Sequence, residues 1–331
     1  DQGGINGRKI KLISLDDGYS PSKTVEQVRR LVEEENVLAI FNPLGTASNS
    51  AIQKYLNVKK VPQLFVSSGS SRFNDPKQFP WTMPWLPSYA AEGRSAVEFI
   101  LKARPNAKLA VLYQNDDLGK DYLRGVHEGL GDKVKSVIKA EISYEVSDPT
   151  VDSAIISLQG SGADTFINIA TPKFAAQAIR KAYDTGWKPY QYVASVGSSI
   201  AAVMIPAGVE RSTGIITGAY VKDPTDPEVQ KTKDYADWAA FMTKYFPEGD
   251  LKDLNTVIGY SIAQTFIKVL QQAGDNLTRE NLMHEAANLH DLSLPMLQPG
   301  LIINTGPNDF QPLKATRLMR FDGQHWRLVE N

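Results

Sequence analysis

Apolar and polar positions alternate along the chain in two recurring periods, which predicts strands followed by helices. Residues 9–15 alternate with period two, as a half-buried strand does, while residues 21–36 carry apolar side chains at helical spacing. Ser20 is suited to be an N-cap and Pro21 to the first helical position. This stretch is therefore expected to form one strand followed by one helix.

The same alternation continues to residue 194. Strands are expected at 37–41, 61–66, 108–113, 134–142, 165–169 and 190–194, and helices at 47–58, 88–101, 118–130, 150–159 and 172–185. Near-continuous apolar strands between helices are typical of parallel sheets covered by helices. The pattern predicts the α/β class.

The pattern changes beyond Pro224. Helices are expected at 227–245, 254–272 and 278–289, and two strand-like runs follow at 315–321 and 325–329. Asp322-Gly323 joins the last two runs, which is a hairpin signal.

Length and composition narrow the possible classes of protein. A single core stops growing at roughly 250 to 300 residues, so 331 residues predict two lobes. A net charge of -1 without a basic run argues against a nucleic-acid partner. No apolar run approaches the roughly 20 residues of a membrane span, so the chain is not expected to be membrane-inserted.

Few side chains are suited to catalysis or metal binding. The chain has no cysteine, which excludes thiolate nucleophiles and Cys-ligated metals, and its four histidines lie far apart. No GxGxxG or GxxxxGK[ST] motif follows an expected strand. We therefore expect no metal and no cofactor.

Small hydroxyl residues follow two expected strands. Gly45 and Thr46 come after strand 37–41, inside a run of residues 37–53 without one ionisable side chain, and Gly69, Ser70 and Ser71 come after strand 61–66. In open parallel sheets, ligands bind at the carboxyl ends of strands. The two loops are either a carboxylate-binding site or ordinary turns and N-caps.

Six segments together resemble the periplasmic solute-binding proteins of branched-chain amino-acid-type ABC transporters. They are Gly3-Gly-Ile-Asn-Gly-Arg-Lys-Ile10, Asp16-Asp17, Asn42-Pro-Leu-Gly45, Gln114-Asn-Asp-Asp-Leu-Gly-Lys-Asp-Tyr122, Lys222-Asp-Pro-Thr-Asp-Pro227 and Leu318-Met-Arg-Phe-Asp-Gly323. The resemblance implies a type I periplasmic binding protein: two Rossmann-like lobes with parallel sheets, joined by a three-segment hinge, closing on a small ligand. It also implies a periplasmic monomer that serves a transporter permease and is not an enzyme.

The resemblance places lobe one at 1–104 and 223–315, and lobe two at 105–222 and 316–331. Members of this family usually begin with a strand and a helix before the segment that starts here at Gly3. The resemblance therefore implies residues upstream of Asp1.

The family's ligand contacts carry over unevenly. Thr46 matches the hydroxyl that holds the ligand carboxylate, with Ser70 and Ser71 as the second carboxylate loop; Gly45 and Gly69 belong to the same two loops. The family's acidic partner for the ligand ammonium aligns with Val196. Two aromatic positions become Leu118 and the pair Ala170 and Thr171.

These differences predict a ligand without an ammonium group. A buried ammonium without a charged partner costs several kcal/mol, whereas a misfitted methylene costs about 1 to 3. We expect a small carboxylate with an apolar, aromatic body. Asp116 or Asp117 are alternative ammonium partners, and they would make the ligand a branched-chain amino acid.

Three further interpretations stay open. Trp85, with Trp81, either forms one wall of the ligand site or packs inside lobe one. An enzyme would need a base and a nucleophile, and the adjacent carboxylates Asp116 and Asp117 are weak support for one. A ligand sensor with the same fold is the remaining alternative.

Overall fold

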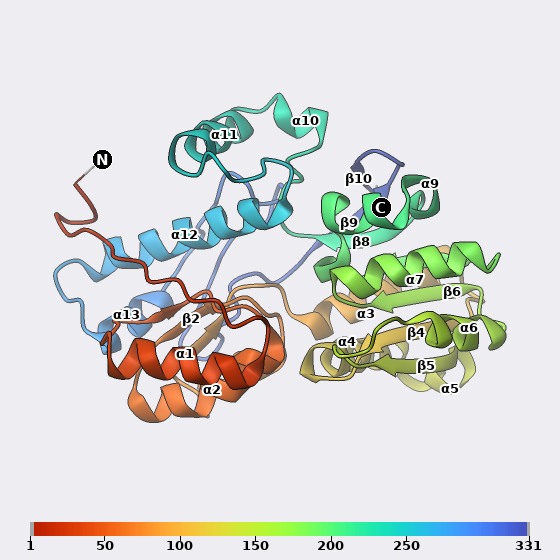
Figure 1. Cartoon of the computed structure of the whole chain (residues 1–331), viewed down its shortest axis with the longest axis horizontal. Helices are drawn as coiled ribbons and strands as arrows, with labels where there is room; N and C mark the ends of the chain where they lie inside the picture. The colour runs from red at the N-terminus through yellow and green to blue at the C-terminus, as the bar shows by residue number, and fades with distance from the viewer. Residues whose placement is uncertain (1–2, 330–331) are drawn as a thin grey trace. The chain divides into compact units, whose positions relative to one another are not determined.

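Strands and helices alternate in both halves of the computed structural model, which describes residues 3–329 (Figure 1). The chain divides into two units, which we call unit 1 and unit 2. Unit 1 comprises residues 1–88, 259–294 and 300–314, and unit 2 comprises 89–258, 295–299 and 315–331. The lobe boundaries inferred from the sequence differ in placing 89–104, 223–258, 295–299 and 315 in lobe one, and they stay a prediction. Their outermost residues, 1–2 and 330–331, lie outside the described part of the chain.

Unit 1 contains a short parallel sheet in the order β1-β2-β3. Its strands are β1 (Ile40–Phe41), β2 (Gln63–Val66) and β3 (Thr82–Pro84), and its helices are α1 (Pro21–Glu33), α2 (Thr46–Lys59), η1 (Ser71–Phe73), α13 (Arg279–Ala286) and residues 259–273 of α12 (Leu254–Ala273). Apolar residues of α1 and α2 pack on β1 in one buried cluster, which includes Val28, Ile52 and Leu56.

The strand predicted at residues 9–15 is wrong. The sheets of the described residues do not include this segment, and Ile10 and Leu12 are 56% and 71% exposed. Alternation favours an extended chain, but a strand also requires a neighbour that completes its hydrogen-bond ladder. The segment instead lines a groove of about 930 Å³ together with residues 37–44, α1 and α12.

Unit 2 contains a seven-stranded sheet in the order β10-β9-β8-β7-β6-β4-β5. Its strands are β4 (Leu109–Gln114), β5 (Ile138–Tyr144), β6 (Thr165–Ile169), β7 (Tyr190–Val193), β8 (Ile216–Ala219), β9 (Arg317–Phe321) and β10 (Trp326–Leu328). Strands β4 to β8 run parallel, and β9 and β10 are antiparallel.

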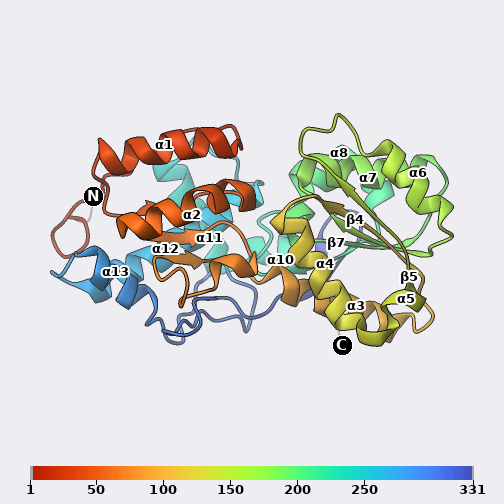
Figure 2. The ribbon, with the colours of Figure 1, turned by 90° about the horizontal axis from the view of Figure 1, so that it is seen from below.

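Helices cover both faces of this sheet (Figure 2). They are α3 (Tyr89–Ala103), α4 (Asp117–Leu130), α5 (Val134–Val137), α6 (Asp152–Gly160), α7 (Pro172–Asp184), α8 (Ile205–Ala207) and α9 (Val209–Ser212), and α10 (Pro227–Gln230) and α11 (Lys233–Tyr245) follow β8. Leu112 and Phe166 pack with α6 and α7, whereas their neighbours Val111 and Ile167 pack with α3 and α4. Both faces of the strands are buried, which explains why the strands appear in the sequence as continuous apolar runs.

Most predicted elements are present, with two differences in unit 2. The strand predicted at 134–142 begins as the short helix α5 and becomes β5 only at Ile138, because Val134 and Val137 also fit one helical turn. The helix predicted at 227–245 is two helices, α10 and α11. Thr232 lies between them and is the N-cap of α11, because its hydroxyl accepts the Tyr235 N–H at 3.2 Å. Strands β3 and β8 were not predicted.

The predicted hairpin between β9 and β10 is confirmed, and Asp322 holds its turn. Its Oδ1 accepts the N–H groups of Gln324 and His325, both at 2.8 Å, and its Oδ2 accepts Nε of Arg327 at 2.9 Å. The His325 N–H, followed by the Gln324 N–H and Arg327, lowers the pKa of Asp322 to about 2.

We expect Asp322→Ala to lower the free energy of unfolding by about 1 kcal/mol at pH 7, the usual cost of losing a capping carboxylate. The folded-state pKa is depressed, so this contribution is complete above the ordinary pKa of 3.8 and is lost as the pH falls through about 2. Urea denaturation at pH 7 and pH 2 tests this, with Asp132→Ala in the exposed 3-10 helix Gly131–Lys133 as control. An equal loss at both pH values would contradict the ionic role.

Candidate functional site

The two hydroxyl loops predicted from the sequence lie side by side in unit 1. Leu44 and Ser67 form a parallel bridge, and the Gly45 N–H donates to the Ser67 carbonyl at 3.3 Å. The Thr46 Oγ1 lies 2.8 Å from the Ser68 Oγ. We call residues 45–46 and 67–71 the unit 1 half-site.

Helix α2 begins in this half-site. Gly45 is its N-cap with φ 96°, a conformation that favours glycine. A Cβ on Gly45 would also come within 2.6 Å of the Tyr19 ring, so the ring lies directly against the helix start. Asp17 helps to hold Tyr19, because its Oδ1 accepts the Tyr19 N–H at 2.8 Å and its Oδ2 accepts the Thr24 hydroxyl at 2.6 Å. The sequence analysis missed Tyr19, whose only signal is its place after the Asp16-Asp17-Gly18 turn.

The half-site is suited to an anion. The first N–H groups of a helix have no carbonyl partner within the helix, and the helix dipole is positive at that end. Thr46 and Ser70 are 0% and 2% exposed, and Ser71 is half-buried at the start of η1. The nearest cation along the chain is Arg72, whose Nε donates to Oε1 of Gln53 at 2.8 Å. Hydroxyls and amides therefore predominate over charged side chains.

Trp85 is fully buried inside unit 1, and its indole N–H donates to the Thr265 Oγ1 at 3.0 Å. Trp81 is half-buried, and its backbone N–H donates to Asn57 Oδ1 at 3.0 Å. This arrangement favours the packing interpretation for Trp85, and contact with a ligand stays a prediction.

The other predicted site residues lie together in unit 2. Leu118, Ala170 with Thr171, and Val196 follow β4, β6 and β7, which are consecutive neighbours in the parallel sheet. The loops after β6 and β7 also approach closely, because a Cβ on Gly197 would lie 2.7 Å from the Ala170 carbonyl oxygen. We call residues 115–118, 170–171 and 195–197 the unit 2 half-site.

A hydrogen-bond network supports two of these loops. Tyr144 donates its hydroxyl proton to Gln114 Oε1 at 3.0 Å and accepts the Thr171 N–H at 3.0 Å. Gln114 Nε2 in turn donates to Oδ2 of Asp116 at 2.6 Å, and Oδ1 of Asp116 caps α4 by accepting the Leu118 N–H at 2.9 Å. Both Asp116 oxygens are thus engaged in holding the loop, which favours a capping role over an ammonium partner.

The loop after β7 rests on a buried carboxylate that the sequence analysis missed. Glu92 of α3 is 3% exposed, and its carboxylate accepts the N–H and the hydroxyl of Ser195 at 2.7 and 2.6 Å. Tyr122 and Tyr192 donate to the same carboxylate at 2.8 and 2.9 Å. Burial raises the pKa of Glu92, and the hydrogen bonds, beginning with that from the Ser195 hydroxyl, oppose the rise. Its signal in the sequence is one charge on the apolar helix face between Tyr89 and Ala96.

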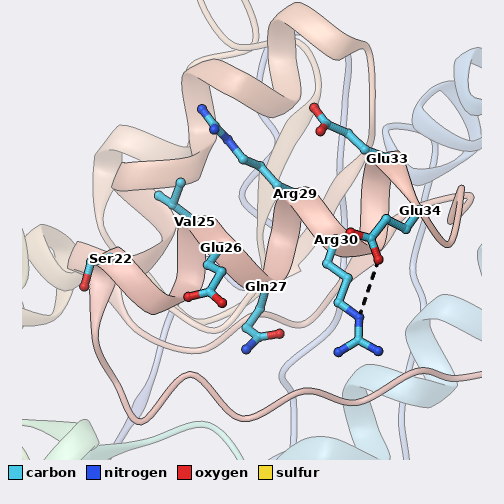
Figure 3. Close-up of a pocket in the computed structure, with 8 residues that line it drawn as sticks. All are labelled: Ser22, Val25, Glu26, Gln27, Arg29, Arg30, Glu33 and Glu34. Carbon is cyan, nitrogen blue, oxygen red and sulfur yellow. Dashed lines mark ion pairs between the residues drawn. The ribbon is translucent and has the colours of Figure 1, made fainter.

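A separate hollow of about 470 Å³ lies along α1 (Figure 3). It is lined by residues of that helix and its end, including Glu26, Arg29 and the pair Arg30 and Glu34, whose side chains lie 4.0 Å apart. Exposed ion pairs of this kind contribute little binding energy. We do not consider it the ligand site.

Comparison with known proteins assigns the family. Residues 1–325 match the model of the periplasmic binding protein family, so the chain belongs to it. Its members are solute-binding proteins. Leu/Ile/Val-binding protein homolog 7 of Brucella abortus is 21% identical over 206 residues, which are 59% of this chain and 50% of that protein. The chain thus matches about half the length of this curated relative.

Solved structures show the fold. A branched-chain amino acid ABC transporter protein from Thermus thermophilus with bound valine has a TM-score of 0.86 at 14% identity, covering 100% of this chain and 87% of that one. A fatty acid ABC transporter substrate-binding protein from Thermomonospora curvata has a TM-score of 0.79 at 22% identity, covering 99% and 82%. The fold is that of the type I periplasmic binding proteins, which confirms the predicted class. In residues 3–329 no helix has the length and hydrophobicity of a membrane span.

Proposed function

We propose that this periplasmic binding protein delivers a small carboxylate with an apolar, aromatic body to an ABC importer permease, as a monomer. The observation that carries the proposal is Val196 in the Ser195–Gly197 turn, the position at which the family resemblance implies the acidic partner of a ligand ammonium. Leu118 and Ala170, which follow neighbouring strands, are also apolar. The unit 1 half-site supplies the amides and hydroxyls that a carboxylate requires.

In this proposal the ligand carboxylate binds the unit 1 half-site first, through Thr46, Ser70 and Ser71. The unit 2 half-site then contacts the apolar body as the protein closes, by the hinge motion that binding proteins use. Closure gives the permease a means to distinguish loaded from empty protein.

A branched-chain amino acid is the second candidate. The Thermus thermophilus protein named above holds valine, and the curated relative is named for leucine, isoleucine and valine. The Thermomonospora curvata protein is named for fatty acids, which carry a carboxylate and no ammonium. Proteins similar to this chain are thus named for both kinds of ligand.

A thermal-shift panel separates the two candidates. The protein is unfolded, stripped of bound ligand, refolded, and mixed with benzoate, cinnamate, leucine, isoleucine or valine, with benzamide as the control that lacks a carboxylate. A ligand at a hundred times its dissociation constant adds about 2.7 kcal/mol of stability. Stabilisation by the aromatic acids alone supports the proposal, whereas stabilisation by the amino acids alone overturns its ligand.

A further inference from the structure

The buried Glu92 carboxylate sets the direction of the hydrogen bonds around Ser195. Oε1 accepts from the Tyr192 hydroxyl at 2.9 Å and the Ser195 N–H at 2.7 Å. Oε2 accepts from the Tyr122 hydroxyl at 2.8 Å and the Ser195 hydroxyl at 2.6 Å. These four donor contacts match the roughly four acceptor positions of an ionised carboxylate, which has no proton to donate.

This arrangement uses the only hydroxyl proton of Ser195. Tyr122 also lies 3.2 Å from the Ser195 Oγ, but its proton is directed to Glu92 as well. The Ser195 Oγ still has its lone pairs, so it can form a hydrogen bond with a further partner only as an acceptor. Ser195 is half-buried and directly precedes Val196 in the unit 2 half-site.

We propose that Glu92 is a positioning residue that makes Ser195 a hydrogen-bond acceptor, so that the unit 2 half-site selects ligands carrying an N–H or O–H donor and discriminates against a second carboxylate. The inference rests on the proposed function, since it assumes that the Ser195–Gly197 turn contacts the ligand. It adds to that function a polar requirement at a position otherwise lined by apolar side chains.

The substitution Glu92→Gln should reverse the preference. The Ser195 N–H and the Tyr192 hydroxyl converge on Oε1, and a backbone N–H cannot change from donor to acceptor. The carbonyl oxygen of the introduced amide therefore occupies the position of Oε1, and its NH₂ group faces the hydroxyls of Tyr122 and Ser195. Both hydroxyls can rotate to accept, which turns the Ser195 proton outward and makes Ser195 a donor.

Calorimetric titration with three kinds of probe tests this reversal. Benzoate is the reference, aminobenzoate adds an uncharged donor, and benzenedicarboxylate adds an acceptor anion, the last two as their 3- and 4-substituted isomers. For the unsubstituted protein we expect one aminobenzoate isomer to bind about tenfold tighter than benzoate, the effect of one additional hydrogen bond. Both dicarboxylates should bind more weakly than benzoate. In Glu92→Gln the ratio of aminobenzoate to dicarboxylate affinity should fall at least about a hundredfold, because aminobenzoate loses one hydrogen bond, about tenfold, and the dicarboxylate gains one, about tenfold.

Two further variants keep the test decisive. Tyr192→Phe removes one donor to Glu92 without altering the Ser195 hydroxyl, so it should retain the original order of probes. Ser195→Ala removes the acceptor, and it should abolish the discrimination among the three kinds of probe, even if Glu92→Gln fails to fold. Unchanged ratios in Ser195→Ala would overturn the inference while the proposed function stands. No binding of benzoate or its derivatives to the unsubstituted protein would overturn both.

Discussion

Replacing Gly125 by alanine is expected to lower the free energy of unfolding of unit 2 by about 3 kcal/mol, the upper range for overpacking a tight core. Gly125 lies where α4 crosses α3, and a Cβ there would come within 2.1 Å of the Ala90 carbonyl oxygen. The obstacle is backbone rather than a flexible side chain, so a helix must move. Gly93 of helix α3 is also close to α4, since its added Cβ would lie 2.4 Å from the Tyr122 carbonyl oxygen.

Urea denaturation followed by circular dichroism measures this effect. Gly160→Ala is the matched control, because Gly160 is also a helical glycine but has no atom within 4 Å of its added Cβ. The control should leave the protein equally or slightly more stable, as alanine is the better helix former. If the two variants were equally stable, α3 and α4 could separate without cost, and the close crossing would not matter for stability. A shift of α4 should also disturb the Tyr122 contact with Glu92.

Replacing Thr46 by valine is expected to raise the dissociation constant of an acid ligand about 10- to 100-fold, because a hydrogen bond to a charged group contributes about 1.5 to 3 kcal/mol. Valine keeps the branched shape and removes only the hydroxyl. That hydroxyl lies 2.8 Å from the Ser68 Oγ, which also accepts the Ser70 N–H at 3.2 Å. Removing the hydroxyl therefore also removes a contact between the two hydroxyl loops.

The measurement is calorimetric titration of the best acid from the thermal-shift panel. Thr217→Val serves as control, because Thr217 is a buried threonine of β8 whose hydroxyl donates to the Val193 carbonyl. The affinity of this control for the acid should stay essentially that of the original protein. A Thr46→Val protein that bound as tightly as the original would remove the unit 1 half-site from the proposal.

The unit 1 half-site could be predicted because its determinants are local. Each strand and the loop that follows it are adjacent in the sequence, and parallel strands bring their carboxyl ends to one edge. The loops that carry Thr46 and Ser70 could therefore be predicted as neighbours without any knowledge of long-range contacts. The α/β class followed in the same way from the spacing of apolar residues.

The support of the unit 2 half-site could not be predicted, because its contacts join distant parts of the chain. Glu92 and Ser195 are 103 positions apart, and Glu92 and Tyr192 are 100 apart. A single sequence shows a charge on an apolar helix face, but not which donors surround it. The prediction of a strand at 9–15 was wrong for a related reason. Alternation of apolar and polar residues describes one strand and does not show whether a neighbouring strand pairs with it.

The groove of unit 1, between residues 9–15, 37–44, α1 and α12, affects the stability of that unit. Among the described residues β1 pairs with β2 alone, and the groove beside it exposes apolar side chains such as Ile10 and Leu12. Any extended segment that covers an open strand edge beside apolar surface can form hydrogen bonds with that strand. It can also bury apolar surface, which contributes about 25 cal/mol of free energy per Å². The stability of unit 1 therefore depends on whether a segment covers this groove. In unit 2, by contrast, helices already cover both faces of the sheet. The free energy of unfolding of unit 1 should accordingly depend on what occupies the groove.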